Sequence, residues 1–375
     1  MTSDDALLRL FLDLVGTPSP SGSERAVADR VLAWLHEVGL QPREDASAEA
    51  TGAGSGNIFV ALPGRGEGTP VVLCAHMDTV AVSGPIQPLV EGGVVRSAGD
   101  TILGADDKTA VAALLALLAE LAVGPPACRV EALFTTCEEV GLRGAKAFDL
   151  GVSQAAAAFV LDGAGPLGEV IVAAPAQKSI TATFKGMAAH AGIEPECGRS
   201  AIVAAARSVA GMPLGRIDEV TTANIGVIEG GVAINIVPEV CVVKGEARSR
   251  DAARLAEQVQ HMIDAIALGA TEAGVDVTTE VVDEYAAFSL PEDCLPARIA
   301  AAALRHIGLE PRFTGTGGGS DVNIFNARGM PSVNLSAGYE KVHTTDEYMP
   351  LERLGQALRL VRALVEVAGR TPPLQ

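Results

Sequence analysis

The spacing of apolar positions changes from helical to extended several times along the first half of the chain. Apolar residues of 3–16 and 22–39 recur at helical spacing, and Gly39 follows the second run as a stop signal. Short apolar runs between turn-forming residues predict strands, and one longer run predicts a buried helix. Up to residue 176 we expect helices at 3–16, 22–39 and 107–122, a loop at 46–56, and strands at 58–62, 71–75, 130–136 and 157–161. Strands that alternate with helices are typical of an α/β layer architecture.

The middle of the chain has a different order of elements. The pattern predicts a strand at 180–185, a helix at 199–210, strands at 221–229 and 237–247, a helix at 250–272 and a strand at 275–282. This β-α-β-β-α-β order is that of ferredoxin-like units. We therefore expect an inserted domain at 177–287 and a larger α/β domain formed by 1–176 and 288–375. The last part of the larger domain should contain a helix at 295–307, a glycine-rich turn at 315–319, a strand at 331–335 and a helix at 351–368.

Composition limits the partners and the location. The 375 residues carry a net charge of −18, which disfavours nucleic acids and anionic membranes because both are negatively charged. The acidic start MTSDDALLRL does not resemble a signal peptide, and the longest apolar run, 109–119, is too short to span a bilayer. The six cysteines form no CxxC pair and do not indicate a disulfide framework. We therefore expect a globular cytoplasmic protein.

Acidic and histidine side chains follow several of the predicted strands. The segments are AHMDTV with His76 and Asp78, GADDKT with Asp106 and Asp107, TTCEEVG with Glu138 and Glu139, VLDG with Asp162, and KVHTTDE with His343. In open α/β sheets, ligands bind beyond the carboxyl ends of the strands. We therefore expect these side chains to gather at one edge of the sheet.

Each segment taken alone has two interpretations. His76 and Asp78 are two positions apart, so they share one face of a strand, where a carboxylate can orient a metal-binding imidazole; the same pair also occurs in ordinary turns. The adjacent Glu138 and Glu139 point in different directions, so that one could bind a metal while the other moves a proton. Acidic residues are also favoured at the start of a helix, whose dipole attracts them.

The other candidates have similar alternatives, and the set as a whole decides between them. Asp106 and Asp107 could cap the apolar helix, Asp162 could be a turn residue, and His343 could be an exposed surface histidine. Two histidines and three carboxylates, however, are a typical ligand set for Zn²⁺, Co²⁺ or Mn²⁺. One bridging carboxylate and two further ligands for each ion would account for five residues. Such a two-metal site activates a water to attack a carbonyl, and a free glutamate would transfer the proton.

With these segments and MAAHAGIEPE around His190, the chain resembles the di-zinc exopeptidase family that includes aminoacylase, carboxypeptidase G and peptidase T. The wording of GADDK, MAAHAGIEPE and HTTDE is most similar to peptidase T-like proteins, and the resemblance covers nearly the whole chain in the same order. It implies a catalytic domain with a mixed sheet flanked by helices, and an inserted lid that also serves dimerisation.

The resemblance also implies a role for each site residue. Asp106 would bridge two metal ions, His76 and Asp162 would complete one site, and Glu139 and His343 would complete the other. Glu138 would be the general base, and Asp78 would orient His76. Members of the family often have a cis peptide after the bridging aspartate, here between Asp106 and Asp107. The ions would be zinc, with cobalt or manganese as alternatives.

Residues of the lid and of the glycine-rich turn would contact the substrate. The resemblance implies that His190 stabilises the oxyanion, and that Asn224 and Arg248 hold the substrate carboxylate. On the residues alone, a single arginine on a strand is more often a surface charge. Gly318 and Gly319 would line the pocket; alternatively, the turn is only the start of a helix capped by Ser320.

The resulting hypothesis is a two-metal hydrolase that cleaves amide bonds of short peptides, of the tripeptide aminopeptidase type. An N-acyl amino acid deacylase or a dipeptidase would use the same chemistry with a different pocket. A non-catalytic peptide-binding protein is a third possibility, which Glu138 beside a full ligand set argues against. The partners would be the small substrate and, through the lid, a second copy of the chain.

Overall fold

The computed structural model describes residues 3–66 and 68–372. The chain divides into two compact units. The first unit comes from residues 1–172, 290–315 and 320–375, and the second from residues 173–289 and 316–319. The second unit is therefore inserted into the first, with a four-residue part of the glycine-rich turn added to it.

The first unit contains a mixed sheet and two groups of helices. Its helices are α1 (Ser3–Val15), α2 (Arg25–Glu37), α3 (Ser47–Thr51), α4 (Ala105–Val123), α5 (Arg143–Ala147), α8 (Leu295–His306), α9 (Asp321–Ala327) and α10 (Leu351–Arg370). Its sheet strands are β1 (Arg43–Glu44), β2 (Ile58–Leu62), β3 (Val71–His76), β6 (Val130–Thr135), β7 (Ala157–Gly163), β8 (Glu169–Ala174), β15 (Arg312–Gly315) and β16 (Ser332–Ser336). The strand order is β1-β2-β6-β3-β7-β16-β8-β14, where β14 is Phe288–Ser289, and β15 also pairs with β8.

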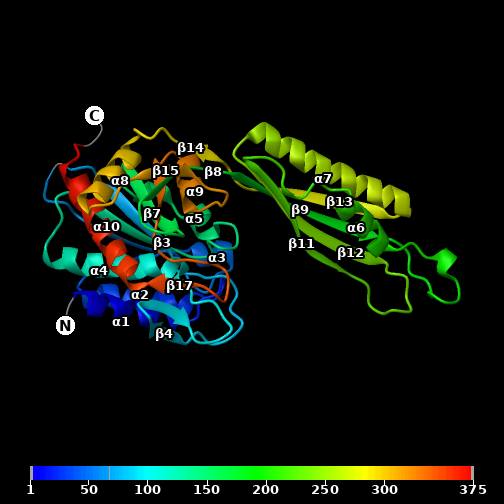
Figure 1. Ribbon diagram of the computed structural model, residues 1–375, viewed down its shortest axis with the longest axis horizontal. Coiled ribbons are helices and arrows are strands. Elements are labelled where there is room, and N and C mark those ends of the chain that lie inside the picture. The colour runs from blue at the N-terminus through cyan, green and yellow to red at the C-terminus, as the bar shows by residue number, and fades with distance from the viewer. Residues whose placement is uncertain (1–2, 67, 373–375) are drawn as a thin grey trace. The chain divides into compact units, whose positions relative to one another are not determined.

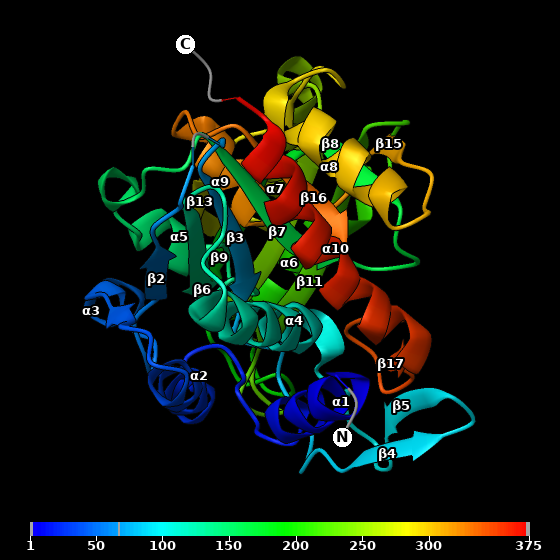
Figure 2. The same cartoon turned by 90° about the vertical axis from the view of Figure 1, so that its left-hand side faces the viewer.

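The four central strands of this sheet run parallel. β3 pairs in parallel with β6 and with β7, and β7 pairs in parallel with β16, whereas β2 and β8 are antiparallel to their neighbours. Helices α4, α8 and α10 pack on one face, and α9 packs on β7 and β16 from the other face together with α5 (Figures 1 and 2). Because both faces are covered, the central strands are buried along almost their whole length.

The sequence pattern did not predict β1, β8, β15 or α5 of the first unit. Two further differences concern a stretch that was expected to be a loop and a separate small sheet. The stretch 46–56 is not a continuous loop, because α3 forms within it: a carboxylate oxygen of Asp45 accepts the N–H of Ser47 at the start, and Gly52, with φ 73°, ends the turn. The second difference is a small antiparallel sheet of β4 (Pro88–Glu91), β5 (Val94–Ser97) and β17 (Tyr348–Pro350), which no apolar alternation predicted because β4 is largely exposed.

The second unit is a sheet with helices on one face. Its elements are β9 (Ala176–Lys185), α6 (Ala201–Ala210), β10 (Gly215–Arg216), β11 (Thr221–Gly230), β12 (Val240–Ser249), α7 (Ala252–Ala273), β13 (Asp276–Tyr285) and β14 (Phe288–Ser289). The antiparallel order β10-β11-β12-β9-β13 is the ferredoxin-like arrangement with one short strand added at the edge. Residues such as Phe184, Met262 and Ile266 form a core of its own between the sheet and the two helices.

The fold class expected from the sequence is therefore confirmed: an α/β unit with a mixed sheet carries an inserted α+β unit. Within the residues that the structure describes, no helix combines the length and the apolar character needed to cross a membrane.

Candidate active site

Three parallel strands bring most of the candidate residues to one edge of the sheet. His76 is the last residue of β3, Glu138 and Glu139 follow β6, and Asp162 lies near the end of β7. Because β6, β3 and β7 are parallel neighbours, their carboxyl ends meet at the same edge. Asp106 was expected after a strand as well, but it stands at the start of α4, where non-helical backbone angles at Asp106 separate it from the regular helix.

One group of side chains surrounds the buried ring of His76. Its Nε2 atom lies 3.2 Å from Oδ1 of Asp106 and 3.7 Å from Oδ1 of Asp162. The His76 side chain is only 2% exposed, and each of the two carboxylate side chains is 11% exposed. The three side chains therefore offer one nitrogen and two oxygens to a single point inside the protein.

A second group lies on the other side of the Asp106 carboxylate. Nε2 of His343 lies 3.1 Å from Oε1 of Glu139 and 3.4 Å from Oδ2 of Asp106. His343 is half exposed and has a positive φ of 62°, so a loop rather than a strand presents it. Asp106 therefore turns one oxygen toward each histidine, as expected of a carboxylate that bridges two ions.

The electrostatics of the cluster favour a cation. Burial raises the pKa of the Glu138 carboxyl well above its usual range, and the nearby Asp162 adds to the rise. Burial likewise raises the pKa of Asp162 to about 7. The carboxylates of Asp106 and Glu139 raise the pKa of His343 to about 10. Each direction reflects negative charge crowded into a buried place, which a divalent cation would offset.

The donor set also fits such an ion chemically. Imidazole nitrogen and carboxylate oxygen are the ligands that Zn²⁺ and similar ions take in proteins. Ligand atoms of His76, Asp106 and Glu139 lie within 4.8 Å of one another, and so do those of His76, Glu138 and Asp162. Glu138 is thus close enough to be a ligand or to act beside one. The peptide bond between Asp106 and Asp107 is cis, as the resemblance implied.

Asp78 contacts the two glutamates more directly than it contacts the histidine. Its carboxylate accepts the N–H groups of Glu138 and Glu139 at 2.9 and 3.2 Å, and the hydroxyl of Ser21 at 2.7 Å. Nδ1 of His76 lies 2.8 Å from the main-chain oxygen of Asp78 and 3.6 Å from its carboxylate. The main chain at Asp78 therefore faces the imidazole, and the side chain fixes the turn that carries Glu138.

Sequence reasoning missed two residues of this site, Tyr339 and Glu347. The hydroxyl of Tyr339 lies 3.0 Å from Oδ1 of Asp106 and 3.3 Å from Oδ1 of Asp162. The carboxylate of Glu347 accepts the N–H groups of Leu103, Gly104 and Asp106. Glu347 belongs to the quoted HTTDE segment, which was a signal, whereas nothing in the sequence distinguishes Tyr339 from a core aromatic residue.

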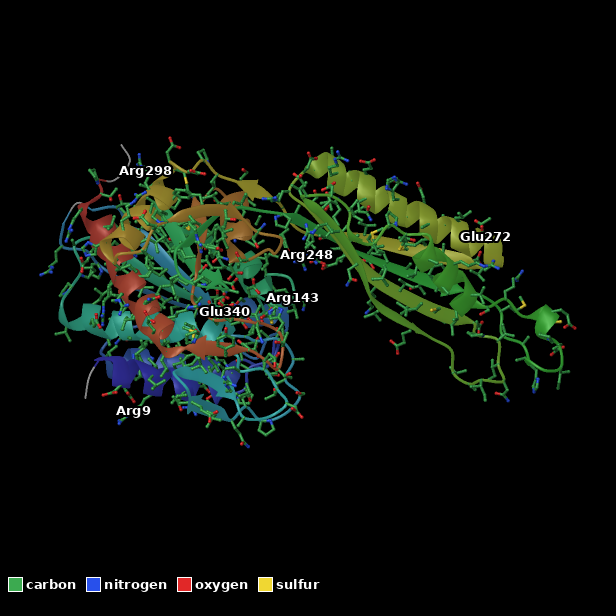
Figure 3. All side chains as sticks on the ribbon, in the orientation of Figure 1. Arg9, Arg143, Arg248, Glu272, Arg298 and Glu340 are labelled. Carbon is green, nitrogen blue, oxygen red and sulfur yellow. The ribbon has the colours of Figure 1, made fainter. Side chains whose placement is uncertain are left out.

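The expected substrate residues all lie in the second unit. His190 is exposed, and its Nδ1 accepts the N–H of Gly192, which leaves the ring proton of the neutral form on Nε2. Asn224 is paired with Glu246 across β11 and β12, so Asn224, Glu246 and Arg248 share one face of the sheet. Arg248, near the end of β12 and labelled in Figure 3, binds both carboxylate oxygens of Glu246 at 3.0 Å.

The glycine-rich turn is the start of a helix, which is the second of the two interpretations that the sequence left open. Ser320 caps α9 in a capping box with Asn323, as the second interpretation expected. Gly318 and Gly319 lie in the second unit, and a Cβ on Gly319 would come within 2.3 Å of the Tyr285 ring. The backbone at Gly319 is therefore packed against an aromatic side chain, and its contact with a substrate stays a prediction.

Comparison with known proteins identifies the family. Residues 72–367 match peptidase family M20/M25/M40. The protein YqjE of Bacillus subtilis (strain 168), described as uncharacterized, is 38% identical over 371 residues, which cover 99% of this chain and 100% of that protein. The crystal structure of aminopeptidase PepT from Bacillus cereus ATCC 10987 is 37% identical, with a TM-score of 0.83 and coverage of 97% of this chain and 98% of that one. A tripeptidase from Staphylococcus aureus subsp. aureus Mu50 is 36% identical, with a TM-score of 0.89 and coverage of 98% and 99%.

The mixed sheet and the cluster of acids and histidines at its edge define the class, a hydrolase with a candidate metal site. The chain belongs to peptidase family M20/M25/M40. The resemblance found in the sequence, including the likeness to peptidase T, is thereby confirmed.

Proposed function

We propose that the protein is a two-metal aminopeptidase that releases the N-terminal residue of short peptides, in the manner of a tripeptidase. The observation that carries this proposal is the placement of Asp106, whose two oxygens face two separate groups of ligands. His76 and Asp162 would complete one site, and Glu139 and His343 the other. The ions would be zinc, with cobalt or manganese as alternatives.

Bound divalent ions would polarise the scissile carbonyl and make a water more acidic. Glu138 is the carboxylate that would accept the water proton and return it to the leaving amine. Burial raises the pKa of the Glu138 carboxyl, which strengthens it as a proton acceptor, and the more basic leaving amine can take the proton from it. Asp78, which accepts the N–H groups of Glu138 and Glu139, would keep the base and the neighbouring ligand in a fixed relation.

The second unit would act as a lid, and we assign residues 177–287 to this lid and residues 1–176 and 288–375 to catalysis. His190 would donate its Nε2 proton to the oxyanion, which fits the acceptor role of its Nδ1 atom. Asn224 and Arg248 would bind the substrate carboxylate, since both extend from the face of the sheet that α6 and α7 leave uncovered. Gly318 and Gly319 would line the pocket beside them.

The choice of a free-amine peptide as substrate is supported by the similarity to an aminopeptidase and a tripeptidase at 36–37% identity over nearly the whole chain. An N-acyl amino acid deacylase or a dipeptidase would use the same metal ligands and the same Glu138. We also propose a homodimer formed through the lid. β10 covers β11 only at Thr222 and Ala223. The uncovered remainder of that edge supports a dimer, because Val227 and Ile228 are 42% and 52% exposed there.

The test combines metal analysis with a substrate panel. The purified full-length chain is analysed for bound metal and assayed with dipeptides, tripeptides and N-acetyl amino acids. Two ions per chain and cleavage of free-amine tripeptides are expected. Cleavage only of N-acyl substrates would instead identify a deacylase, and cleavage only of dipeptides a dipeptidase. Absence of both metal binding and hydrolysis after addition of zinc, cobalt or manganese would overturn the proposal. Light scattering of the same sample reports whether the protein is a dimer.

A further inference from the structure

We propose that Tyr339 and Glu347 are positioning residues that hold Asp106 in its bridging orientation, each with a different effect on the two metal sites. This inference rests on the proposed two-metal function. It is carried by contacts around Asp106 that lie entirely within the first unit. Both residues belong to one segment, residues 339–348, which we call the Asp106-holding loop.

The ends of the Asp106-holding loop are joined to each other. Glu340 and Tyr348 exchange both main-chain hydrogen bonds, at 3.0 and 3.2 Å. The Glu340 side chain, labelled in Figure 3, binds Arg353 of α10 at 2.6 Å, which ties this end of the loop to a helix that packs on the core of the first unit. The paired residues Glu340 and Tyr348 form the neck of the loop. Tyr339 comes just before this neck, and Glu347 and His343 lie within the loop that it closes.

Tyr339 fixes the side chain of Asp106. Its hydroxyl is shared between Oδ1 of Asp106 and Oδ1 of Asp162, and the residue is only 1% exposed. Both of these oxygens belong to the group around His76. In the part of the chain that the structure describes, the contacts of the Tyr339 hydroxyl do not include Oδ2 of Asp106, which faces His343. Loss of the hydroxyl should therefore disturb the His76 site more than the His343 site.

Glu347 fixes the main chain of Asp106. One oxygen accepts the N–H of Asp106 at 3.1 Å, and the other accepts the N–H groups of Leu103 and Gly104 at 2.9 and 2.8 Å. The residue is 1% exposed, so water does not replace these contacts readily. Because Asp106 serves both groups of ligands, a shift of its backbone should weaken both sites together.

The loop thus contacts Asp106 at three points: its N–H through Glu347, Oδ1 through Tyr339 and Oδ2 through His343. Residues that orient a metal ligand typically change metal affinity by about 10- to 100-fold when they are replaced. The two substitutions should differ in the number of sites they affect, which a general loss of packing would not produce.

The experiment titrates the metal-free full-length chain with Co²⁺ and follows the visible absorption of the bound ion. Tyr339→Phe removes the hydroxyl and keeps the ring, so we expect one of two binding steps to weaken by roughly 10- to 100-fold and the cobalt spectrum of that step to change. Glu347→Gln keeps the shape but replaces one acceptor oxygen by a donor, so both steps should weaken. Tyr348→Phe is the matched control: Tyr348 joins the loop neck through main-chain atoms, which this change of the side chain leaves in place, so the variant should bind Co²⁺ as the unmodified chain does.

The outcomes separate this inference from the proposed function. If the unmodified chain binds two Co²⁺ ions and cleaves peptides while Tyr339→Phe binds both ions with unchanged affinity and spectrum, the positioning role is overturned and the function stands. Equal weakening of both steps in Tyr339→Phe would also overturn it, because this indicates a general structural loss. If the unmodified chain binds no Co²⁺, the two-metal function itself fails. Melting temperatures of the metal-free variants show that each chain is folded.

Discussion

Glu138 is the carboxylate at which the structure permits the sharpest test of the chemistry. Its main chain is held by Asp78, so a substitution of the side chain should leave the turn intact. Glu138→Gln removes the proton acceptor and keeps the size and the hydrogen-bonding reach. We expect turnover to fall by about 10²- to 10⁴-fold, because this is the usual contribution of a general base. Steady-state kinetics with a tripeptide measures the effect.

Metal content gives the control for this variant. If Glu138 acts only as a base, the Glu138→Gln protein should still hold two ions per chain. Loss of one ion would show that Glu138 is a ligand, an alternative that its proximity to His76 and Asp162 allows. Retention of full activity would exclude both roles and would move the proton transfer to another group.

A second single residue, Arg248, provides a test of substrate recognition. Its guanidinium is held in place by both oxygens of Glu246, and Gln177 also binds Glu246, at 2.6 Å. If Arg248 binds the substrate carboxylate, Arg248→Ala should lower kcat/KM for a free tripeptide by roughly 10- to 100-fold, as expected for a lost charged hydrogen bond. The same peptide with a C-terminal amide should be cleaved equally poorly by both proteins.

The matched control is Arg254→Ala, which removes an exposed arginine from α7 on the other side of the sheet. For the Arg254→Ala variant, the ratio of kcat/KM between the free and the amidated tripeptide should equal that of the unmodified chain. If Arg248→Ala lowers kcat/KM equally for the free and the amidated peptide, the arginine has a structural role and does not bind the substrate carboxylate.

The sequence predicts the candidate ligands better than the residues that position them. His76, Glu138, Glu139 and Asp162 are recognisable because each ends or follows a run of apolar strand residues. Tyr339 contacts Asp106 only because the chain folds back between residues more than 200 positions apart, and no local pattern encodes such a contact. The candidate ligands can therefore be located from the positions of the strands, whereas a positioning residue such as Tyr339 depends on tertiary packing.

At the scale of elements, most buried strands of the first unit were predicted, whereas the exposed β4 and the buried β8 were not. The buried strands β3, β6 and β7 lie where the apolar runs predicted them, within one or two residues at their ends. β4 was not predicted because three of its four residues are exposed and carry no apolar alternation. A Gly92–Gly93 turn between β4 and β5 was the one local signal for this hairpin.

Two helix glycines give opposite predictions for the same substitution. A Cβ on Gly269 of α7 would lie 2.3 Å from Oγ of Ser208 in α6, so the glycine permits the close approach of the two helices. Gly269→Ala should therefore destabilise the second unit, by about 1–3 kcal/mol for an overpacked contact. A Cβ on Gly355 of α10 would meet its nearest atom at 3.7 Å, which is ordinary contact. Gly355→Ala should stabilise the protein by roughly 0.5–1 kcal/mol, since alanine loses less entropy in a helix.

Thermal unfolding followed by circular dichroism measures both variants against the unmodified chain. The prediction concerns the sign: the melting temperature should fall for Gly269→Ala and rise for Gly355→Ala. An increase for Gly269→Ala would mean that α6 and α7 can separate without cost, and the packing argument for the second unit would be wrong.

At the scale of the whole molecule, each unit has a core of its own. Residues such as Phe11, Phe134 and Leu364 form the core of the first unit, and Phe184 and Met262 belong to that of the second. The candidate metal ligands all lie in the first unit. A ligand that binds only one folded unit stabilises that unit alone, and chains with two units commonly unfold in more than one step.

Removal of divalent ions should therefore destabilise the first unit selectively. Its buried cluster of carboxylates would lose the charge that offsets their repulsion, and an ion present at a hundred times its dissociation constant contributes about 2.7 kcal/mol per site. Calorimetry of the full-length chain, before and after treatment with a chelator, should show one transition that moves to lower temperature and one that does not. Gly269→Ala identifies the second transition, because it should shift only the unit that contains α7. If the chelator shifts both transitions equally, the second unit depends on the metal centre for its stability and does not behave as an independent fold.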